Sequence, residues 1–143
     1  MASINRKVIE QAKKEILKEV SLRRREAPFL VWLFSIIGFY VARFFVILFP
    51  DFKLIVFGYH IHHFYYGVVL LAISGSLAIT FKGIKMVRVS CILYGLGLGI
   101  IFDEIGFFLS GGDYWSEITF IIFYSFLATS IMLYFLWDFL RSL

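Results

Sequence analysis

The sequence contains little cysteine, little proline and little charge. Among its 143 residues there are one cysteine, Cys91, and two prolines, and charged residues make up 17% of the chain. A lone cysteine excludes an intrachain disulfide and argues against an iron–sulfur or copper(I) centre. Hydrophobic residues account for 61%, which is more apolar surface than one small globular core can bury. The composition therefore predicts an integral membrane protein.

Four long apolar stretches predict an all-α fold, a four-transmembrane-helix bundle. A helix that crosses a bilayer needs about 20 mostly apolar residues, because each residue adds about 1.5 Å to its length. The stretches cover residues 28–49, 54–81, 86–109 and 114–140. Their connections are short, so we interpret residues 28–143 as one transmembrane domain.

Residues 1–27 have a different composition from the rest of the chain. They hold eight Lys or Arg and four Glu, with no uninterrupted apolar run. This segment is therefore neither a signal peptide nor a span. Apolar residues recur at roughly helical spacing between the charges, which predicts a basic amphipathic helix against anionic lipid at the membrane surface, or against the bundle. A solvated extension that helps to set the topology is an equal alternative.

Positive charge gathers at one end of the predicted spans. Segments 1–27 and 82–88 and the terminal Arg141 carry cations, whereas the opposite connections, 50–53 and 110–117, contribute only Lys53. The positive-inside rule then predicts a multi-pass protein of the cell membrane with both termini in the cytoplasm. We interpret the net charge of +4 as a feature that sets the topology and attracts anionic lipid. We expect no nucleic-acid partner.

Ionisable residues within the predicted spans form the candidate site. All three histidines lie in the segment GYHIHHFYYG, and an Asp-Glu pair lies in FDEIGFF. Helical rise places these groups, together with one arginine, roughly 8 to 13 Å below the outer ends of their spans. The six residues are Arg43, His60, His62, His63, Asp103 and Glu104. Charged groups at that depth are costly without partners, so we expect them to face one another in a single site.

Helical phase limits how the histidines meet. In a regular helix His60 and His63 share one face, while His62 points nearly the opposite way. The three imidazoles therefore reach a single ion only if the segment is unwound near residues 58–60. Otherwise His62 has a different partner.

Glycines mark the third span as the central helix. Gly95 and Gly99 form a GxxxG pattern, which lets a neighbouring backbone approach closely. Asp103 shares their face, and Glu104 lies about 100° away around the helix. We therefore expect this helix to present Asp103 to one neighbour and Glu104 to another.

Imidazole nitrogen and carboxylate oxygen are ligands of divalent zinc and iron. We predict a divalent metal ion, zinc before iron, in the outer half of the membrane. The predicted ligands are His60, His62, His63, Asp103 and Glu104. An open coordination position would let the metal activate water, with Glu104 or Glu117 as general base and Arg43 stabilising a developing anion. This is the hypothesis of a membrane metallohydrolase.

Two other functions are open. Histidines and carboxylates relay protons in channels and transporters, although the polar groups here are confined to the outer half, so conduction would need a homo-oligomer. Alternatively, Arg43 pairs with Asp103 or Glu104 only to neutralise buried charge and fix the helix register, as in a non-catalytic scaffold.

The segment HIHHFYYGVVLL, followed by GLGLGIIFDEIGFFL and DYW, resembles a set of small archaeal and bacterial integral membrane proteins. These carry paired histidines at the head of one span and an Asp-Glu pair within the next. The likeness covers residues 60–115 and implies no established activity. It does imply that His62, His63, Asp103 and Glu104 act as a unit.

Overall fold

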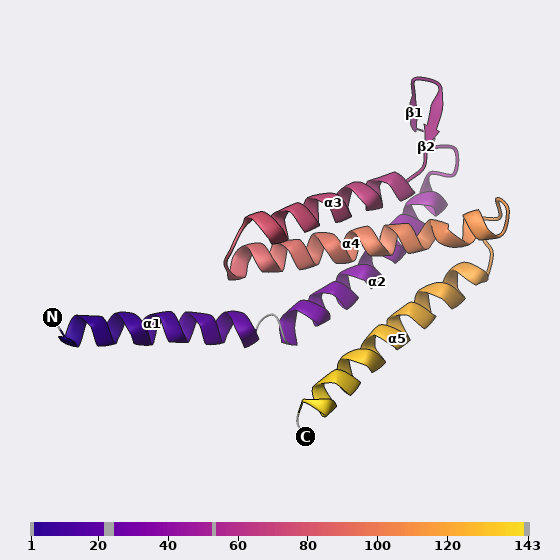
Figure 1. Cartoon of the computed structure of the whole chain (residues 1–143). Helices are drawn as coiled ribbons and strands as arrows, with labels where there is room; N and C mark the ends of the chain where they lie inside the picture. Colours follow the sequence, from indigo (N-terminus) through magenta and orange to yellow (C-terminus); the bar gives the residue numbers. More distant parts are fainter. Residues whose placement is uncertain (1, 22–24, 53, 142–143) are drawn as a thin grey trace.

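A computed structural model of the chain describes residues 2–21, 25–52 and 54–141, and the side chains from residue 8 onward, so Ile4, Arg23, Arg24 and Lys53 lie outside the side chains described. Figure 1 shows helices joined by short connections and one small hairpin. In chain order the elements are α1 (Ala2–Ser21), α2 (Ala27–Leu48), β1 (Leu54–Val56), β2 (Tyr59–Ile61), α3 (Phe64–Thr80), α4 (Ile84–Leu109) and α5 (Ile118–Leu140). The predicted all-α class is confirmed, with the hairpin as an addition.

Three helices in the described part of the chain are long and apolar enough to cross a membrane. They are α2, α4 and α5, with 22, 26 and 23 residues. Helix α3 is also apolar but has only 17 residues, so it is about 26 Å long. Three of the four predicted spans therefore correspond to helices that could cross a membrane, and the second corresponds to a shorter apolar helix.

The second predicted span, 54–81, is wrong over its first ten residues. Strand β1 pairs with β2 in antiparallel register, with Ile55 opposite His60, and α3 begins only at Phe64. The turn between the strands places Phe57 at φ 51° and Gly58 at φ 83°. Left-handed backbone at both turn residues matches the twist of a tight hairpin, and the flanking residues are β-branched or aromatic. These local preferences outweigh the apolar composition that favoured a helix.

The fourth predicted span, 114–140, begins four residues later than expected. Gly111 and Gly112 both have positive φ, which ends α4 in a turn. The Asp113 side chain then accepts a hydrogen bond from the Trp115 backbone N–H at 2.9 Å, a local turn that competes with helix. The result is an ordered connection that presents Tyr114 to the interior.

Helix α4 is the central helix, as predicted, and its glycines explain why. It packs against α2 on one side and α3 on the other. A Cβ added at Gly95 would lie 2.6 Å from the Val31 carbonyl oxygen of α2. A Cβ added at Gly97 would lie 2.8 Å from the Gly67 carbonyl oxygen of α3. The GxxxG pattern and its neighbour therefore bring both partner backbones into contact with α4.

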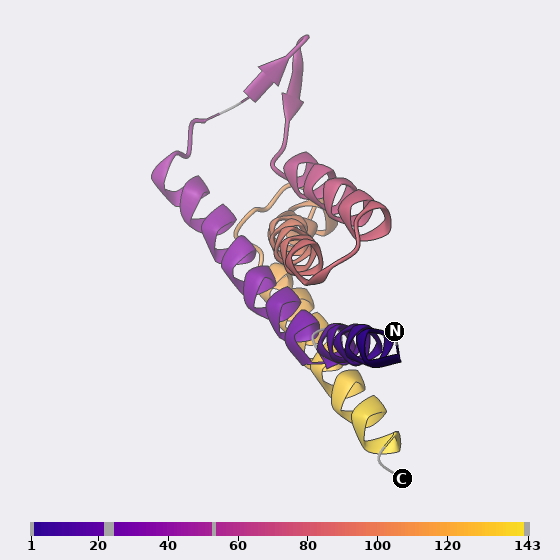
Figure 2. The ribbon, with the colours of Figure 1, turned by 90° about the vertical axis from the view of Figure 1, so that its left-hand side faces the viewer.

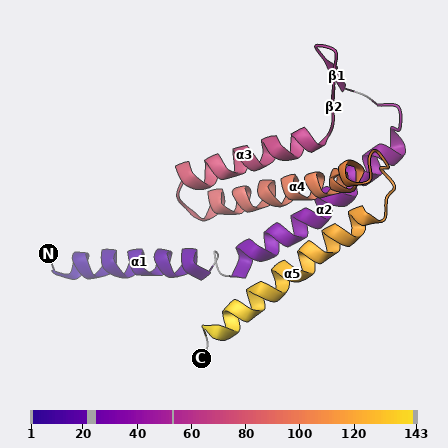
Figure 3. The same ribbon diagram turned by 45° about the vertical axis from the view of Figure 1, so that its right-hand side comes forward.

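Helices α1 and α5 are attached less closely. Helix α5 runs beside α2 (Figure 3), where the rings of Phe39 and Phe123 stack with centroids 4.1 Å apart. Helix α1 extends away from the other helices (Figure 1), with Val8, Ile16 and Val20 exposed. The helix predicted in residues 1–27 is thus confirmed over Ala2–Ser21, whereas its contact with lipid stays a prediction.

The two ends of α4 differ in the residues that they gather. We call the end with β1, β2 and the α4–α5 connection the hairpin end. The opposite end has Lys82 in the α3–α4 connection and Lys85 at the start of α4, and we call it the basic end. The ionisable groups of the candidate site lie at the hairpin end.

Candidate functional site

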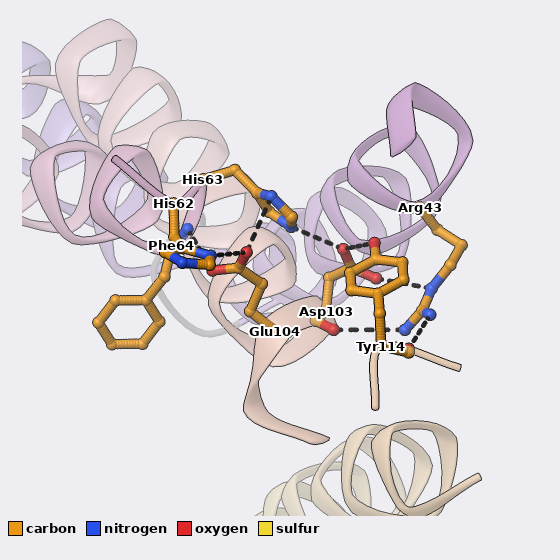
Figure 4. Close-up of polar contacts among 7 residues, drawn as sticks. All are labelled: Arg43, His62, His63, Phe64, Asp103, Glu104 and Tyr114. Carbon is orange, nitrogen blue, oxygen red and sulfur yellow. Dashed lines mark hydrogen bonds and ion pairs between the residues drawn. The ribbon is translucent and has the colours of Figure 1, made fainter. Parts of the chain in front are cut away.

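Five of the seven predicted site residues meet at the hairpin end (Figure 4). Arg43 comes from the last turns of α2, and Asp103 and Glu104 come from α4. His62 and His63 come from the link between β2 and α3, so this segment is unwound, as one of the two predicted alternatives required. The expected convergence of ionisable groups from different segments is confirmed for these five residues.

Asp103 and Arg43 form a buried ion pair. The Arg43 Nε lies 2.7 Å from the Asp103 Oδ1, and the side chains are 6% and 0% exposed. The angle of this contact is not that of a well-aligned hydrogen bond. The other guanidinium nitrogens donate to main-chain oxygens, Nη1 to Tyr114 at 2.7 Å and Nη2 to Asp103 at 3.3 Å. Arg43 therefore joins α2 to α4 and to the connection that follows α4.

Tyr114 completes the surroundings of Asp103. Its hydroxyl donates a short hydrogen bond to Asp103 Oδ2, and the Arg43 guanidinium carbon lies 4.2 Å from the centre of its ring. The pKa of Tyr114 is raised well above its ordinary value of 10.0, first because burial disfavours the phenolate and then because Asp103 repels it. Tyr114 therefore stays a hydrogen-bond donor. Sequence reasoning missed it, and the only signal was its place in the DYW motif.

His63 bridges the two carboxylates. Its Nε2 lies 2.9 Å from Asp103 Oδ2, and its Nδ1 lies 3.1 Å from Glu104 Oε1. A neutral imidazole carries hydrogen on one nitrogen only and a lone pair on the other. A neutral His63 would therefore face one ionised carboxylate with a lone pair, which is repulsive. One additional proton removes this conflict, whether His63 Nδ1 or Glu104 Oε1 carries it.

The same proton balances the charge of the cluster. Arg43 contributes one positive charge, whereas Asp103 and Glu104 contribute two negative charges. With both histidines neutral the sum is one negative charge, and one added proton would bring it to zero. Because uncompensated charge is costly in a buried site, the neutral arrangement is the one that its burial favours.

Glu104 also caps α3. Its Oε2 accepts the Phe64 backbone N–H at 3.0 Å, one of the N–H groups that the first turn of a helix leaves unpaired. A carboxylate is favourable at this end of the helix dipole. Its Oε1 lies 3.1 Å from the Nδ1 of His62. His62 therefore contacts Glu104, whereas the Nε2 of His63 contacts Asp103. Glu104 thus occupies the Nδ1 of His62. The Nε2 of His62 is on the opposite edge of the ring and does not take part in this contact.

A cleft of about 430 Å³ opens beside the cluster. Its walls come from the end of α2, the hairpin, the start of α3 and the end of α4, and most of its lining is aromatic or aliphatic. Its histidine and carboxylate lining residues are His60, His62, His63 and Glu104. The aromatic lining residues are Phe45, Phe49, Phe52, Tyr66, Phe107 and Tyr114. The cluster therefore faces a largely apolar space of the size that small ligands occupy.

Two predicted site residues lie apart from the cluster. His60 is exposed on β2, although its ring centre is 4.3 Å from that of His62. Glu117 is exposed at the start of α5, and its role as a general base gains no support from a contact with the cluster in the described residues. Both roles stay predictions.

The predicted metal site stays a prediction as well. Among the described residues, no group of three or more His, Cys, Asp and Glu side chains has an arrangement that could hold a metal ion. All four carboxylate oxygens of Asp103 and Glu104 already contact donors within the chain. These oxygens are therefore better placed to orient the imidazoles than to bind a metal directly.

Comparison of the chain with protein-family models, with curated proteins and with solved structures finds no match. The resemblance drawn from the HIHHFYYG and FDEIGFF motifs therefore stays a prediction.

Proposed function

We propose that this chain is a multi-pass membrane protein whose buried cluster is an acid–base site that exchanges a proton with a ligand in the cleft. The observation that carries the proposal is the position of His63, with both ring nitrogens within 3.1 Å of carboxylate oxygens. We assign one shared proton to His63 and Glu104, because a lone pair on His63 Nδ1 would otherwise face the Glu104 carboxylate. Intramembrane ionisable groups commonly mark a site of function.

The residues of the cluster have different roles. Asp103 is the fixed anion, held by Arg43 and Tyr114, so it orients His63 without changing its own charge. Glu104 and His63 share the proton. We assign Arg43 as a counter-charge rather than a catalytic residue, because its nitrogens contact Asp103 and Tyr114.

His62 is the group that we place in contact with the ligand. Its Nδ1 faces Glu104 at 3.1 Å, which selects the tautomer with hydrogen on Nδ1 and a lone pair on Nε2. A carboxylate behind an imidazole is the arrangement that prepares histidine as a general base. The aromatic walls of the cleft favour a lipid-soluble molecule that brings a hydroxyl or amine hydrogen to His62.

Conduction of protons through a single chain has less support. Toward the basic end the buried polar side chains include Ser35, Ser74 and Ser90. Ser74 donates to the Ser90 carbonyl oxygen and Ser35 donates to the Val31 carbonyl oxygen. Both hydroxyls donate to main-chain carbonyl oxygens rather than to another group that could pass a proton on, so they do not extend the cluster into a relay.

Nitrogen-15 NMR of the imidazoles tests the proposal, and a chain with three histidines gives a simple spectrum. In lipid nanodiscs at neutral pH we expect His63 to show the shared proton and His62 to show hydrogen on Nδ1 alone. Glu104→Gln should change both signals, because it removes the carboxylate that they share. Glu117→Gln is the matched control and should change neither.

Two results would contradict the acid–base proposal. The first is a His63 that is neutral, with an unshared lone pair on Nδ1, in the intact protein. The second is a spectrum that Glu104→Gln leaves unchanged. A His60→Gln variant assigns the remaining signal, since His60 lies outside the network.

A divalent metal ion is the second candidate, favoured by the proximity of His60 and His62. Their ring centres lie 4.3 Å apart, and metal-binding histidines commonly donate their other N–H to a carboxylate, as His62 would to Glu104. In this version Asp103 and Glu104 orient the imidazoles instead of binding the metal. Elemental analysis after purification without chelators tests the metal site. Near-stoichiometric zinc or iron that is lost in His62→Ala would support the metal site, and an undetectable metal content would exclude it.

A further inference from the structure

The β1–β2 hairpin extends sideways from the helices. In Figure 1 it leaves the start of α3 across the direction of the helix axes, and in Figure 2, where α3 and α4 are seen nearly end-on, it lies outside their outline. A hairpin that continued along the helix axes would enter the water beyond the membrane. This one instead lies level with the hairpin ends of α2 and α3.

The hairpin is largely apolar. Ile55 and His60 lie on one face, and the other face has Leu54, Val56, Tyr59 and Ile61. All three residues of β1 are exposed, and so are Tyr59 and His60 of β2. Phe57 at the turn is 97% exposed and Tyr59 is 75% exposed. Residues 54–61 include no Asp, Glu, Lys or Arg. An antiparallel ribbon in water normally has a polar face, and an isolated two-stranded hairpin is only marginally stable there.

The turn has an unusual residue at its first central position. Phe57 has φ 51°, a left-handed conformation that Asn, Asp or Gly normally occupies in tight hairpin turns. A bulky aromatic residue in this conformation is strained. An apolar environment around the tip would offset that strain, because it would bury the aromatic ring.

The length of α3 sets the level of the hairpin. At about 26 Å, its 17 residues are slightly shorter than the hydrocarbon core of about 30 Å. The start of α3, and the hairpin joined to it, then lie near the boundary between acyl chains and headgroups. Aromatic side chains favour this boundary. Headgroup water can also pair with the outer edges of the strands, which pure hydrocarbon cannot do.

We propose that the hairpin lies in the membrane interface as an anchor, with Phe57 and Tyr59 in contact with lipid. The bilayer then covers the exposed apolar side chains of the strands and of the turn. Leu54, His60 and Ile61 of the hairpin also line the cleft, so the anchor holds one wall of the cleft at the lipid surface. The anchor rests on the proposed membrane location of the chain, but it does not depend on the acid–base chemistry of the cluster.

Fluorescence quenching tests the anchor. The native cysteine is replaced by Cys91→Ala, and Phe57→Cys then receives an environment-sensitive NBD label. The protein is reconstituted in phosphatidylcholine vesicles with or without lipids that carry a nitroxide near the headgroup or at the fifth acyl carbon. We expect these shallow quenchers to reduce the emission at least twofold, while iodide in the water has little effect.

A matched label at Asp113→Cys provides the control. Asp113 is exposed in the connection after α4 at the same end of the helices, and iodide should quench it. If Phe57→Cys does not fold, Tyr59→Cys is the second position. Iodide quenching at the hairpin without lipid quenching would overturn the proposal. So would the absence of lipid quenching together with disulfide cross-linking of the unlabelled Phe57→Cys protein, because a second copy would then cover the hairpin.

Discussion

Two arginine–carboxylate pairs lie at opposite ends of the molecule. At the hairpin end, Arg43 Nε lies 2.7 Å from Asp103 Oδ1, and the side chains are 6% and 0% exposed. At the basic end, Arg88 Nη2 lies 2.6 Å from Glu26 Oε2, and the side chains are 46% and 50% exposed. The distances are nearly equal, so distance does not distinguish the pairs. Their surroundings do, because loss of one partner leaves a buried charge in the first pair and a solvated charge in the second.

Substituting each arginine provides the largest expected contrast. We expect Arg43→Met to lower the free energy of unfolding by about 3 to 5 kcal/mol, because Asp103 would remain buried without its counter-charge. We expect Arg88→Met to lower it by at most about 1 kcal/mol, as for other exposed pairs. Unfolding by SDS in mixed micelles, followed by circular dichroism, measures both values.

A double substitution sharpens the first contrast. Asp103→Asn combined with Arg43→Met removes both charges, and we expect it to recover part of the stability that Arg43→Met loses. Equal losses for Arg43→Met and Arg88→Met would show that the two environments do not differ in solvation. The assignment of Asp103 as a buried anion would then be wrong.

Tyr114 adds a pH-dependent contribution at the buried end. Its pKa is raised above 10.0, so the folded chain keeps this proton at pH values where the unfolded chain releases it. The free energy of unfolding therefore falls as pH rises above about 10. Tyr114→Phe should lower the free energy of unfolding by about 1.5 to 3 kcal/mol at neutral pH. The substitution removes a hydrogen bond to the charged carboxylate of Asp103.

The pH dependence gives the clearer test of Tyr114. The difference between the wild type and Tyr114→Phe should narrow as pH rises past 10, since the raised pKa then costs the wild type stability. Unfolding curves at several pH values between about 8 and 11 measure it. The exposed Tyr94→Phe is the control. A constant difference across this range would argue against the buried tyrosine donor.

The comparison also shows what could be read from the sequence. The convergence of Arg43, His63 and the Asp-Glu pair could be predicted, because helical rise fixes depth and buried charges need partners. The central position of α4 could be predicted from its glycine pattern. These features depend on periodicity and charge, which a sequence displays directly.

Other features of the site depend on local backbone geometry or on tertiary contacts. Apolar composition predicts a helix at residues 54–61 as readily as a strand, and only the Phe57–Gly58 turn decides. Tyr114 reaches Asp103 because the turn at Gly111 and Gly112 reverses the chain. The capping of Phe64 by Glu104 joins residues 40 positions apart. Such contacts leave little periodic signal in the sequence.

The approach of α3 to α4 positions the histidines over the carboxylates, and Gly67 is the residue that tests it. A Cβ at Gly67 would lie 2.7 Å from the Gly97 carbonyl oxygen and from Ile101 Cγ1. Gly67→Ala should therefore separate the helices and lower stability by about 1 to 3 kcal/mol. The increased separation should also change the imidazole NMR signals of His62 and His63, because both precede α3.

Gly75 lies on the same helix and provides the matched control. A Cβ there would meet no atom within 4 Å, so Gly75→Ala should raise stability by up to about 1 kcal/mol, through better helix propensity. Its NMR signals for His62 and His63 should match the wild type. If Gly67→Ala lowered stability but left those signals unchanged, close packing at Gly67 would stabilise the fold without positioning the site. The geometry of His63 would then depend on its ionic contacts alone.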